Sequence, residues 1–193
     1  MTELGRMLLF MVSCVFTHNV VFARLLGGSA LLRQTGTLKT AAAVGLQTTL
    51  ALIISAAGNW LVARLVLAPL HLDSLSLIAF AVVIAGSVAL AGALFRRACP
   101  KLGDALNAEL PLLGAGTLLL AASMTAADGS FIEAVLGGLF LGLGFLLALV
   151  LMAGVQERLE FSKIPQPLKG YPISLISASL MALAFMGFAG IGG

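Results

Sequence analysis

Side chains that could carry chemistry are few among the 193 residues of this chain. The two cysteines, Cys14 and Cys99, form no repeated spacing, so neither a disulfide framework nor a zinc site is predicted. They also make a poor iron–sulfur site, because such clusters usually take four thiolates. The sequence has no phosphate-binding loop, no dinucleotide-binding glycine motif, no H-E-x-x-H and no C-x-x-C motif. No autonomous catalytic activity is therefore expected.

Polar side chains inside apolar stretches are the remaining candidates. His18 and Asn19 either have a functional role or, as we expect, bond to another helix or reach lipid headgroups. Gln47, Thr48 and Thr49 are expected to form hydrogen bonds across helices. No Asp or Glu lies in the middle of an apolar stretch, although a self-contained proton or sodium pump would normally have one there.

The composition defines the class of protein that must position these residues. Hydrophobic residues make up 60% of the chain and charged residues only 10%, against about 45–50% and about 25% in soluble domains. The 22 glycines suit closely packed membrane helices. Residues 1–193 are therefore predicted to form a single integral membrane domain, embedded in the lipid bilayer, with no soluble domain and no role in nucleic-acid binding.

Six stretches are long and apolar enough to cross a bilayer, which takes about 20 residues per helix. The predicted fold is an all-α integral membrane protein of six transmembrane helices. These stretches are Leu4–Ala23, Thr40–Ala63, Ser76–Phe95, Leu106–Met124, Ile132–Val155 and Ile173–Gly190.

Basic residues divide unevenly between the two faces that six spans create. One face receives nine of the eleven Lys and Arg residues, whereas the other, which carries both termini, receives Arg6 and Arg64. The positive-inside rule places the nine-residue face in the cytoplasm and both termini outside. The nine are Arg24, Arg33, Lys39, Arg96, Arg97, Lys101, Arg158, Lys163 and Lys169.

Two glycine-interrupted segments indicate an internal repeat. Leu25 to Ser29 and Leu112 to Thr117 both carry glycines at the edge of an apolar stretch. With three spans in each half, the halves (about 1–95 and about 100–193) would be inverted three-helix repeats. Broken segments in such repeats point to a binding site at the interface between the repeats. Chance recurrence in a glycine-rich chain is the alternative explanation. The candidate site residues are Gly27, Gly28, Ser29, Gly114, Gly116 and Thr117.

Several stretches along the chain resemble one family nearly end to end. The chain resembles the A-type membrane component of the Rnf (Rsx) electron-transport complex and its relative, the E-type component of the sodium-pumping NADH:quinone reductase. The most specific matching stretches are Gln156–Leu159, Ile164–Pro167, Gly170 and Leu175–Phe188; others are His18-Asn19, Arg24–Gly27, Gly45–Thr49 and Leu110–Leu112.

This resemblance implies one component of a complex in the bacterial inner membrane that moves electrons between ferredoxin and NAD while it translocates ions. Its partners would be a homologous sister membrane subunit (of the E type), inserted in the opposite sense, and other Rnf subunits that carry flavin and iron–sulfur clusters. In the family, two cysteines from each sister hold a shared [2Fe–2S] cluster within the membrane.

The chain departs from the family pattern at the cluster ligands. The family cysteines align with Ser29 and Thr117, and Gly116 replaces the asparagine before the second cysteine. A hydroxyl is a poor substitute for a thiolate, so we expect this chain to bind no cofactor alone and to contribute no ligand to a [2Fe–2S] cluster. The family also tends to carry a glutamate in the third span, where this chain has Gly92.

Two other functions stay open at this point. A six-span substrate-binding component of a vitamin or metal importer has a similar length and basic inner loops, and it would need no cluster cysteines. An assembly or scaffold protein is a third possibility. Co-purification separates the first two, because an Rnf-type component predicts flavin and iron–sulfur partners and an importer component predicts an ATPase pair.

The uneven charge distribution predicts that the loops Arg96–Lys101 and Lys163–Lys169 face the cytoplasm. Cysteine-accessibility labelling measures this directly. A position in the Lys163–Lys169 loop that is labelled only from outside the cell would contradict the predicted topology.

Overall fold

The computed structural model describes residues 19, 21–22, 38–70, 75–98, 116–123 and 130–188. These residues form helices and turns, with no strand among them. Helix α4 (Leu38–Val62) continues through a π-helical turn, η2 (Ala63–Leu67), into the short α5 (Ala68–Leu70). Then follow α6 (Ser76–Ala98), a helix at 116–123, α9 (Phe131–Glu160), the 3-10 turn η4 (Gln166–Leu168) and α10 (Tyr171–Met186).

Three of these helical segments are long and apolar enough to cross a membrane: Leu38–Leu67, Ser76–Arg97 and Phe131–Glu160. They confirm the second, third and fifth predicted spans, and the chain is a multi-pass membrane protein. The sixth predicted span is a shorter apolar helix, Tyr171–Met186. Most of the first and fourth predicted spans lies outside the described residues.

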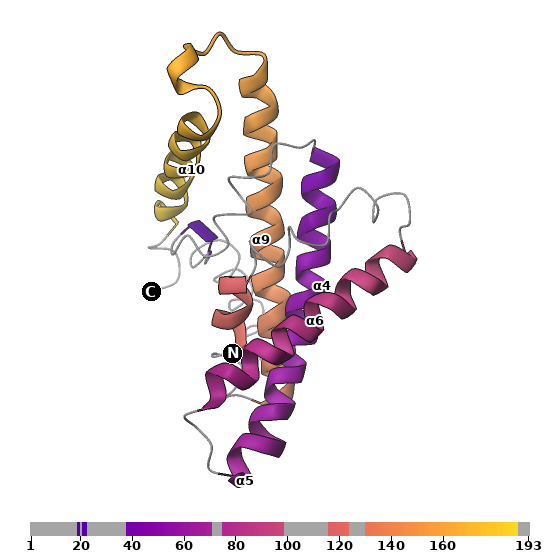
Figure 1. Cartoon of the computed structure of the whole chain (residues 1–193). Helices are drawn as coiled ribbons and strands as arrows, with labels where there is room; N and C mark the ends of the chain where they lie inside the picture. Colours follow the sequence, from indigo (N-terminus) through magenta and orange to yellow (C-terminus); the bar gives the residue numbers. More distant parts are fainter. Residues whose placement is uncertain are drawn as a thin grey trace, which may run out of the picture.

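Helices α4 and α9 run antiparallel and form the central pair (Figure 1). Glycines allow them to approach closely. A Cβ atom on Gly142 would lie 2.8 Å from Thr49 Cα, and one on Gly138 would lie 2.9 Å from the Leu52 carbonyl oxygen. The glycines of α9 thus lie directly against the backbone and small side chains of α4, as small residues permit in membranes.

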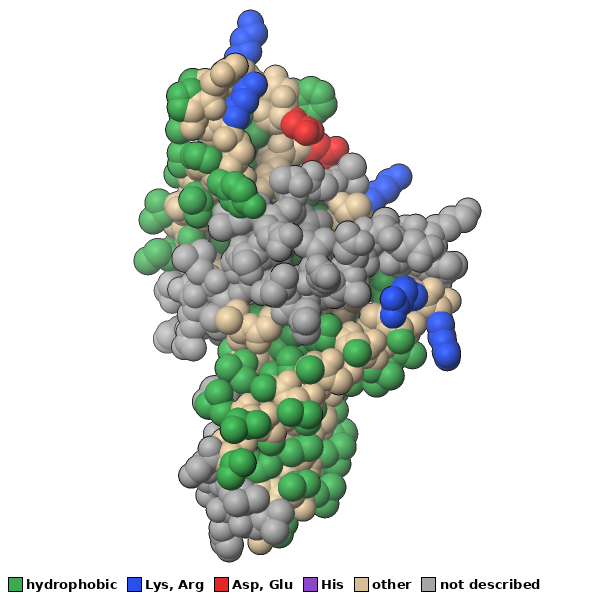
Figure 2. All heavy atoms as spheres, viewed as in Figure 1, with side chains coloured by type: hydrophobic (Ala, Val, Ile, Leu, Met, Phe, Trp, Pro, Cys, Tyr) green, Lys and Arg blue, Asp and Glu red, His purple; other side chains and the backbone are tan. Residues whose placement is uncertain are grey.

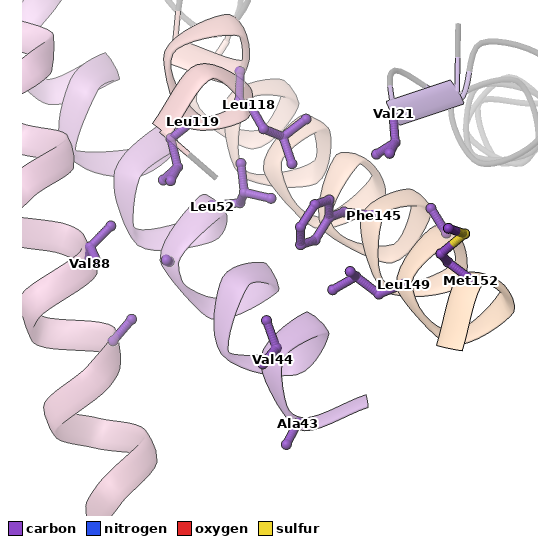
Figure 3. Packing of buried hydrophobic residues seen from close by; sticks show 14 of the residues in the cluster. Val21, Ala43, Val44, Leu52, Val88, Leu118, Leu119, Phe145, Leu149 and Met152 are labelled. Atoms are coloured by element: carbon purple, nitrogen blue, oxygen red, sulfur yellow. The ribbon is translucent and has the colours of Figure 1, made fainter. Parts of the chain in front are cut away.

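The buried core gathers around this pair. Leu52 of α4, Phe145 of α9 and Leu118 of the 116–123 helix point towards a common centre (Figure 3), and all three are fully buried. Leu119 and Leu149 are fully buried in the same cluster. The helix at 116–123 is therefore part of the core even though most of the fourth span is undescribed.

Helix α6 crosses α4 obliquely and packs against it, whereas α10 lies beside α9 with far less contact (Figure 1). Both helices expose large apolar side chains, as lipid-facing helices do, and hydrophobic side chains cover the length of α6 in Figure 2. The exposed apolar residues are Leu77, Ile78, Val82, Leu90 and Leu94 on α6, and Leu175, Ile176, Leu180, Leu183 and Met186 on α10.

Local chemistry explains the ends of the long helices. Ser130 and Glu133 form a reciprocal capping box at the start of α9, in which each side chain accepts the other residue's backbone N–H. Near the end of α4, Pro69 lacks an N–H and its ring conflicts with the carbonyl four residues earlier. The chain there winds as a π turn, and the Ala68 N–H donates to the Ala63 carbonyl.

The close contact between α4 and α9 predicts that Gly142→Ala destabilises the protein by about 1–3 kcal/mol, because the added methyl group overlaps the Thr49 backbone. Gly137→Ala is the matched control on the same helix. No atom lies within 4 Å of its added Cβ, and helix propensity predicts a gain of up to about 1 kcal/mol. The measurement is the free energy of unfolding in mixed micelles; equal stability of the two variants would contradict the backbone contact.

Candidate functional site

Two of the candidate site residues lie in the described part of the chain, and four lie outside it. Gly27, Gly28, Ser29 and Gly114 lie outside the described residues, so the predicted meeting of the two broken segments is untested. Gly116 and Thr117 are helical and belong to the described residues 116–123. The end of the second broken segment is therefore part of a helix.

The described part of this helix has a buried side and an exposed side. Leu118 and Leu119 are fully buried, whereas Thr117 is exposed and Gly116 is half-buried. A Cβ atom at Gly116 would meet no atom within 4 Å. Thr117, which the resemblance aligns with a family cysteine, thus lies at the surface of this chain rather than inside its core.

A buried polar cluster anchors the helical residues 116–123 to α4. We call Ser55, Asn59 and Ser123 the Asn59 cluster; all three are fully buried. The Asn59 Nδ2 donates to Ser55 Oγ at 3.1 Å and to Ser123 Oγ. Ser123 Oγ in turn donates to the Leu119 carbonyl oxygen at 2.7 Å. These bonds fix the helical residues 116–123, which include Thr117, relative to the central helix pair.

The expectation that Thr49 bonds across helices is wrong. Its hydroxyl donates to the Gly45 carbonyl oxygen at 2.7 Å, one turn earlier on the same helix. The reason is steric: the rest of the Thr49 side chain packs against Gly142 of α9, so the hydroxyl turns back to its own helix.

Gln47 and Thr48 likewise show no cross-helix bond from their oxygen atoms. Gln47 Oε1 and Thr48 Oγ1 are buried and have no hydrogen-bond partner within the described part of the chain. The Gln47 Nε2 lies 3.4 Å from the position that a Cβ would occupy at Gly92 of α6. A larger polar residue at position 92 would therefore meet the Gln47 amide.

Asn19 forms the bond between segments that the sequence predicts. Its Nδ2 donates to the Gly144 carbonyl oxygen of α9 at 3.1 Å, and its Oδ1 accepts from the Val21 N–H at 3.1 Å. The side chain is 2% exposed. Asn19 thus pins the end of the first predicted span to α9, and its neighbour His18 lies outside the described residues.

The loop that carries the most specific resemblance connects α9 to α10. Gln156 Nε2 donates to Ser174 Oγ at 3.4 Å, which joins the two helices at this end. Gly170 has φ of 86°, a conformation that favours glycine, directly before α10 begins. Lys163 and Lys169 are exposed in the same loop. The loop is a solvated turn held by its glycine and by the bond at its base.

The far end of the central pair carries an aromatic cluster. The rings of Trp60 and Phe131 pack edge to face at 5.2 Å, and the Arg64 guanidinium lies 6.0 Å from the Trp60 ring centre. Tryptophan and arginine together are typical of the membrane–water interface. No group of three or more His, Cys, Asp or Glu residues that could hold a metal occurs in the described ranges.

Sequence analysis missed the Asn59 cluster. Ser55 and Asn59 are one helical turn apart in the second span, a spacing that places two polar groups on one face. That signal was available from the sequence. The partner Ser123 is 64 residues further along the chain, and only the fold brings it to Asn59.

Comparisons with known proteins agree over almost the whole chain. Residues 7–192 match the family described as "Rnf-Nqr subunit, membrane protein". The A component of the Na(+)-translocating ferredoxin:NAD(+) oxidoreductase complex of Acetobacterium woodii is 36% identical over 187 residues, which cover 96% of this chain and 97% of the relative. The A component of the ion-translocating oxidoreductase complex of Syntrophotalea carbinolica is 38% identical, and the match covers 96% of this chain and 97% of the relative. The corresponding component of Azotobacter vinelandii is 37% identical, and the match covers 99% of this chain and 98% of the relative.

The contacts of Asn19 predict that Asn19→Ala lowers the free energy of unfolding by about 1 kcal/mol, because it removes a buried bond to α9. Ser179→Ala is the control, since that hydroxyl is exposed and bonds only to its own helix at the Leu175 carbonyl. Unfolding in mixed micelles measures both variants. An Asn19 variant as stable as the control would contradict the anchoring role.

Proposed function

Because the chain belongs to the Rnf-Nqr family of membrane subunits, we propose that it is the A-type membrane component of an ion-translocating ferredoxin:NAD oxidoreductase complex. The observation that carries this proposal is the family match over residues 7–192, together with relatives that align over almost their full length. The same match favours this function over an importer component. The chain works within its complex and has no activity of its own.

The packing of α4 against α9 supports the proposed arrangement of two inverted three-helix repeats within a single membrane domain. In such an arrangement the second and fifth spans are equivalent and run in opposite directions. The contacts agree with this: Gly45 of α4 meets Leu146 of α9, and Leu52, further along α4, meets Gly138, earlier on α9. A twofold axis in the membrane plane would pass near the Leu52–Gly138 contact.

In this proposal both termini face the outside of the bacterial inner membrane. The basic residues at the helix ends support this orientation. Lys39 lies in the first turn of α4, Arg96 and Arg97 lie in the last turn of α6, and Arg158 lies in the last turn of α9. The antiparallel pair brings the start of α4 and the end of α9 to the same face. Arg64 and Trp60 then lie at the outer interface.

The chemistry of the available donors does not fit the family's [2Fe–2S] cluster. Thr117 is exposed, and its hydroxyl would have to deprotonate to replace a thiolate, which is costly where the dielectric constant is low. The equivalent position in the first half is Ser29. We therefore assign this chain no cluster ligand. Its partners in this proposal are a sister membrane subunit of the E type and other components that carry flavin and iron–sulfur clusters.

The role left to this chain is to build the membrane part of the complex. Its central helices meet through glycines and a fully buried apolar core, so they form a tight barrier to ions and water. Among the described residues, carboxylates occur only at helix ends, at Glu133, Glu157 and Glu160. Within the described helices, any charge movement through this chain would therefore involve neutral polar groups.

Purification of the complex through this chain tests the proposal. We expect proteins that contain flavin and iron–sulfur clusters to co-purify and the preparation to transfer electrons between ferredoxin and NAD. An ATPase pair in their place would contradict it and support the importer.

The donor chemistry predicts that changing Ser29 or Thr117 to alanine leaves the iron content and the reduced-state EPR spectrum of the purified A-type and sister pair unchanged. Cysteines at both positions should create a cluster signal only if the sister has two cysteines of its own. A stoichiometric [2Fe–2S] signal that disappears in Ser29→Ala or Thr117→Ala would show that these hydroxyls are ligands.

A further inference from the structure

The loop between α9 and α10 exposes a large aromatic side chain just beyond the helices. Phe161 follows the last residue of α9 and is 87% exposed, the largest exposed fraction of any large apolar side chain in the described ranges. Hydrogen bonds within the loop hold its backbone: the Ser162 N–H donates to the Leu159 carbonyl at 3.0 Å, and the Leu168 N–H donates to the Pro165 carbonyl at 3.0 Å. Phe161 therefore stands on an ordered turn, and a partner that contacts it does not have to order the loop first.

The length of α9 places Phe161 outside the lipid hydrocarbon. Glu133 and Glu157 bound the uncharged part of α9, and the two residues are about 36 Å apart along the helix axis at 1.5 Å per residue. A hydrocarbon layer of about 30 Å centred on this part ends near Val155, and Phe161 lies about 9 Å further along the axis. The headgroup layer on each side of the bilayer is only about 5–8 Å thick. Phe161 thus lies at or beyond the headgroup surface.

Tyr171 marks the headgroup level on the neighbouring helix. The bond from Gln156 to Ser174 sets α9 and α10 side by side at this end, and Tyr171 precedes Ser174 by about one helical turn. The Tyr171 side chain is 63% exposed, and tyrosine is typical of the membrane–water interface. The loop of residues 161–170 connects the ends of the two helices at one extremity of the molecule (Figure 1). It therefore projects from the headgroups towards water.

The charges of this loop indicate the kind of partner that fits it. Residues 161–170 contain two exposed lysines, Lys163 and Lys169, and no Asp or Glu. Lys and Arg side chains stand clear of the rest of the molecule at the top of Figure 2. Glu157 and Glu160 belong to α9, before the loop begins. An exposed aromatic ring next to two cations suits a protein surface that offers an apolar pocket with carboxylates around it.

We propose that Phe161, Lys163 and Lys169 form a docking surface for an acidic, water-soluble component of the complex on the cytoplasmic side. Phe161 anchors the contact by leaving water, and the lysines steer the acidic partner and set its orientation. Anionic lipid headgroups would occupy the lysines but would leave the Phe161 ring in water, so a protein partner accounts for more of the surface. This inference rests on the proposed function, which supplies the complex and the inner position of the loop.

Rebinding of soluble components to salt-washed membranes tests the surface. The probe is the soluble fraction that concentrated NaCl releases from membranes containing the complex. The readout is the dissociation constant for its return to the washed membranes at low salt. We expect Phe161→Ala to raise this constant about tenfold or more, as the loss of an aromatic anchor does. Lys163→Glu combined with Lys169→Glu should weaken binding as well and remove most of its dependence on salt.

Leu180→Ala is the matched control for Phe161→Ala. Leu180 is 61% exposed, but it lies in the middle of α10, within the hydrocarbon, so this variant should bind the soluble fraction as the unchanged chain does. Lys163→Arg combined with Lys169→Arg keeps both charges and should keep the affinity.

Carbodiimide coupling identifies the partner's chemistry, because it joins lysine amines directly to carboxylates. In the unchanged complex we expect it to link Lys163 or Lys169 to an Asp or Glu of a soluble component, mapped by mass spectrometry. The double arginine variant should lose this link while it keeps its affinity, since guanidinium groups do not react. Lysines that couple to no soluble component would overturn the docking surface.

The remaining outcomes separate the surface from the proposed function. Equal dissociation constants in all loop variants would overturn the surface, and so would charge variants that act only in phosphatidylglycerol nanodiscs and not in phosphatidylcholine nanodiscs. A soluble fraction that needs Phe161 but holds no flavin or iron–sulfur cluster would reject the proposed function and keep the surface. Iron–sulfur components that transfer electrons between ferredoxin and NAD and bind all variants equally would do the reverse.

Discussion

The direct contact of α4 with α9 through glycine is the interaction on which the rest of the described structure depends. Lipid offers no hydrophobic gain for joining two apolar helices, so close packing has to supply the stability. Gly138 and Gly142 remove the side chains that would hold the helices apart. The remaining elements are then placed relative to this pair: α6 on α4, the 116–123 helix on its core, and α10 beside α9.

Polar groups inside this packing follow a second constraint, because bilayer hydrocarbon offers them no water. Most hydroxyls meet it locally, as Thr49 and Ser177 do by bonding to carbonyls of their own helices. Among the described residues, Asn19 bonds to α9 and Asn59 bonds to Ser123, so these side chains connect different segments. Those two amides connect parts of the chain that are far apart in sequence, so they specify the arrangement more than the hydroxyls do.

Hydropathy and charge predicted the coarse features well, and contacts between helices poorly. The second, third and fifth spans agree with the structure to within a few residues, because apolar length alone decides whether a helix can span. The predicted cross-helix bond of Thr49 is wrong, since rotation about a helix axis cannot be read from hydropathy when the helix is apolar on all sides. For the same reason the pairing of Asn59 with Ser123 was missed. At the candidate site, the resemblance identified Thr117, but only the fold shows that this residue is exposed.

The unequal lengths of the long helices have a consequence for the surrounding lipid. The segments Leu38–Leu67 and Phe131–Glu160 each have 30 residues, about 45 Å of helix, which exceeds the hydrocarbon thickness of about 30 Å. Helix α10, with 16 residues, spans only about 24 Å. One side of the protein therefore has to tilt or project into the headgroups, whereas the side with α10 draws the bilayer thinner. The bilayer around the protein would thus have an uneven thickness, and a neighbouring membrane protein with a similarly short hydrophobic span would share that deformation beside α10.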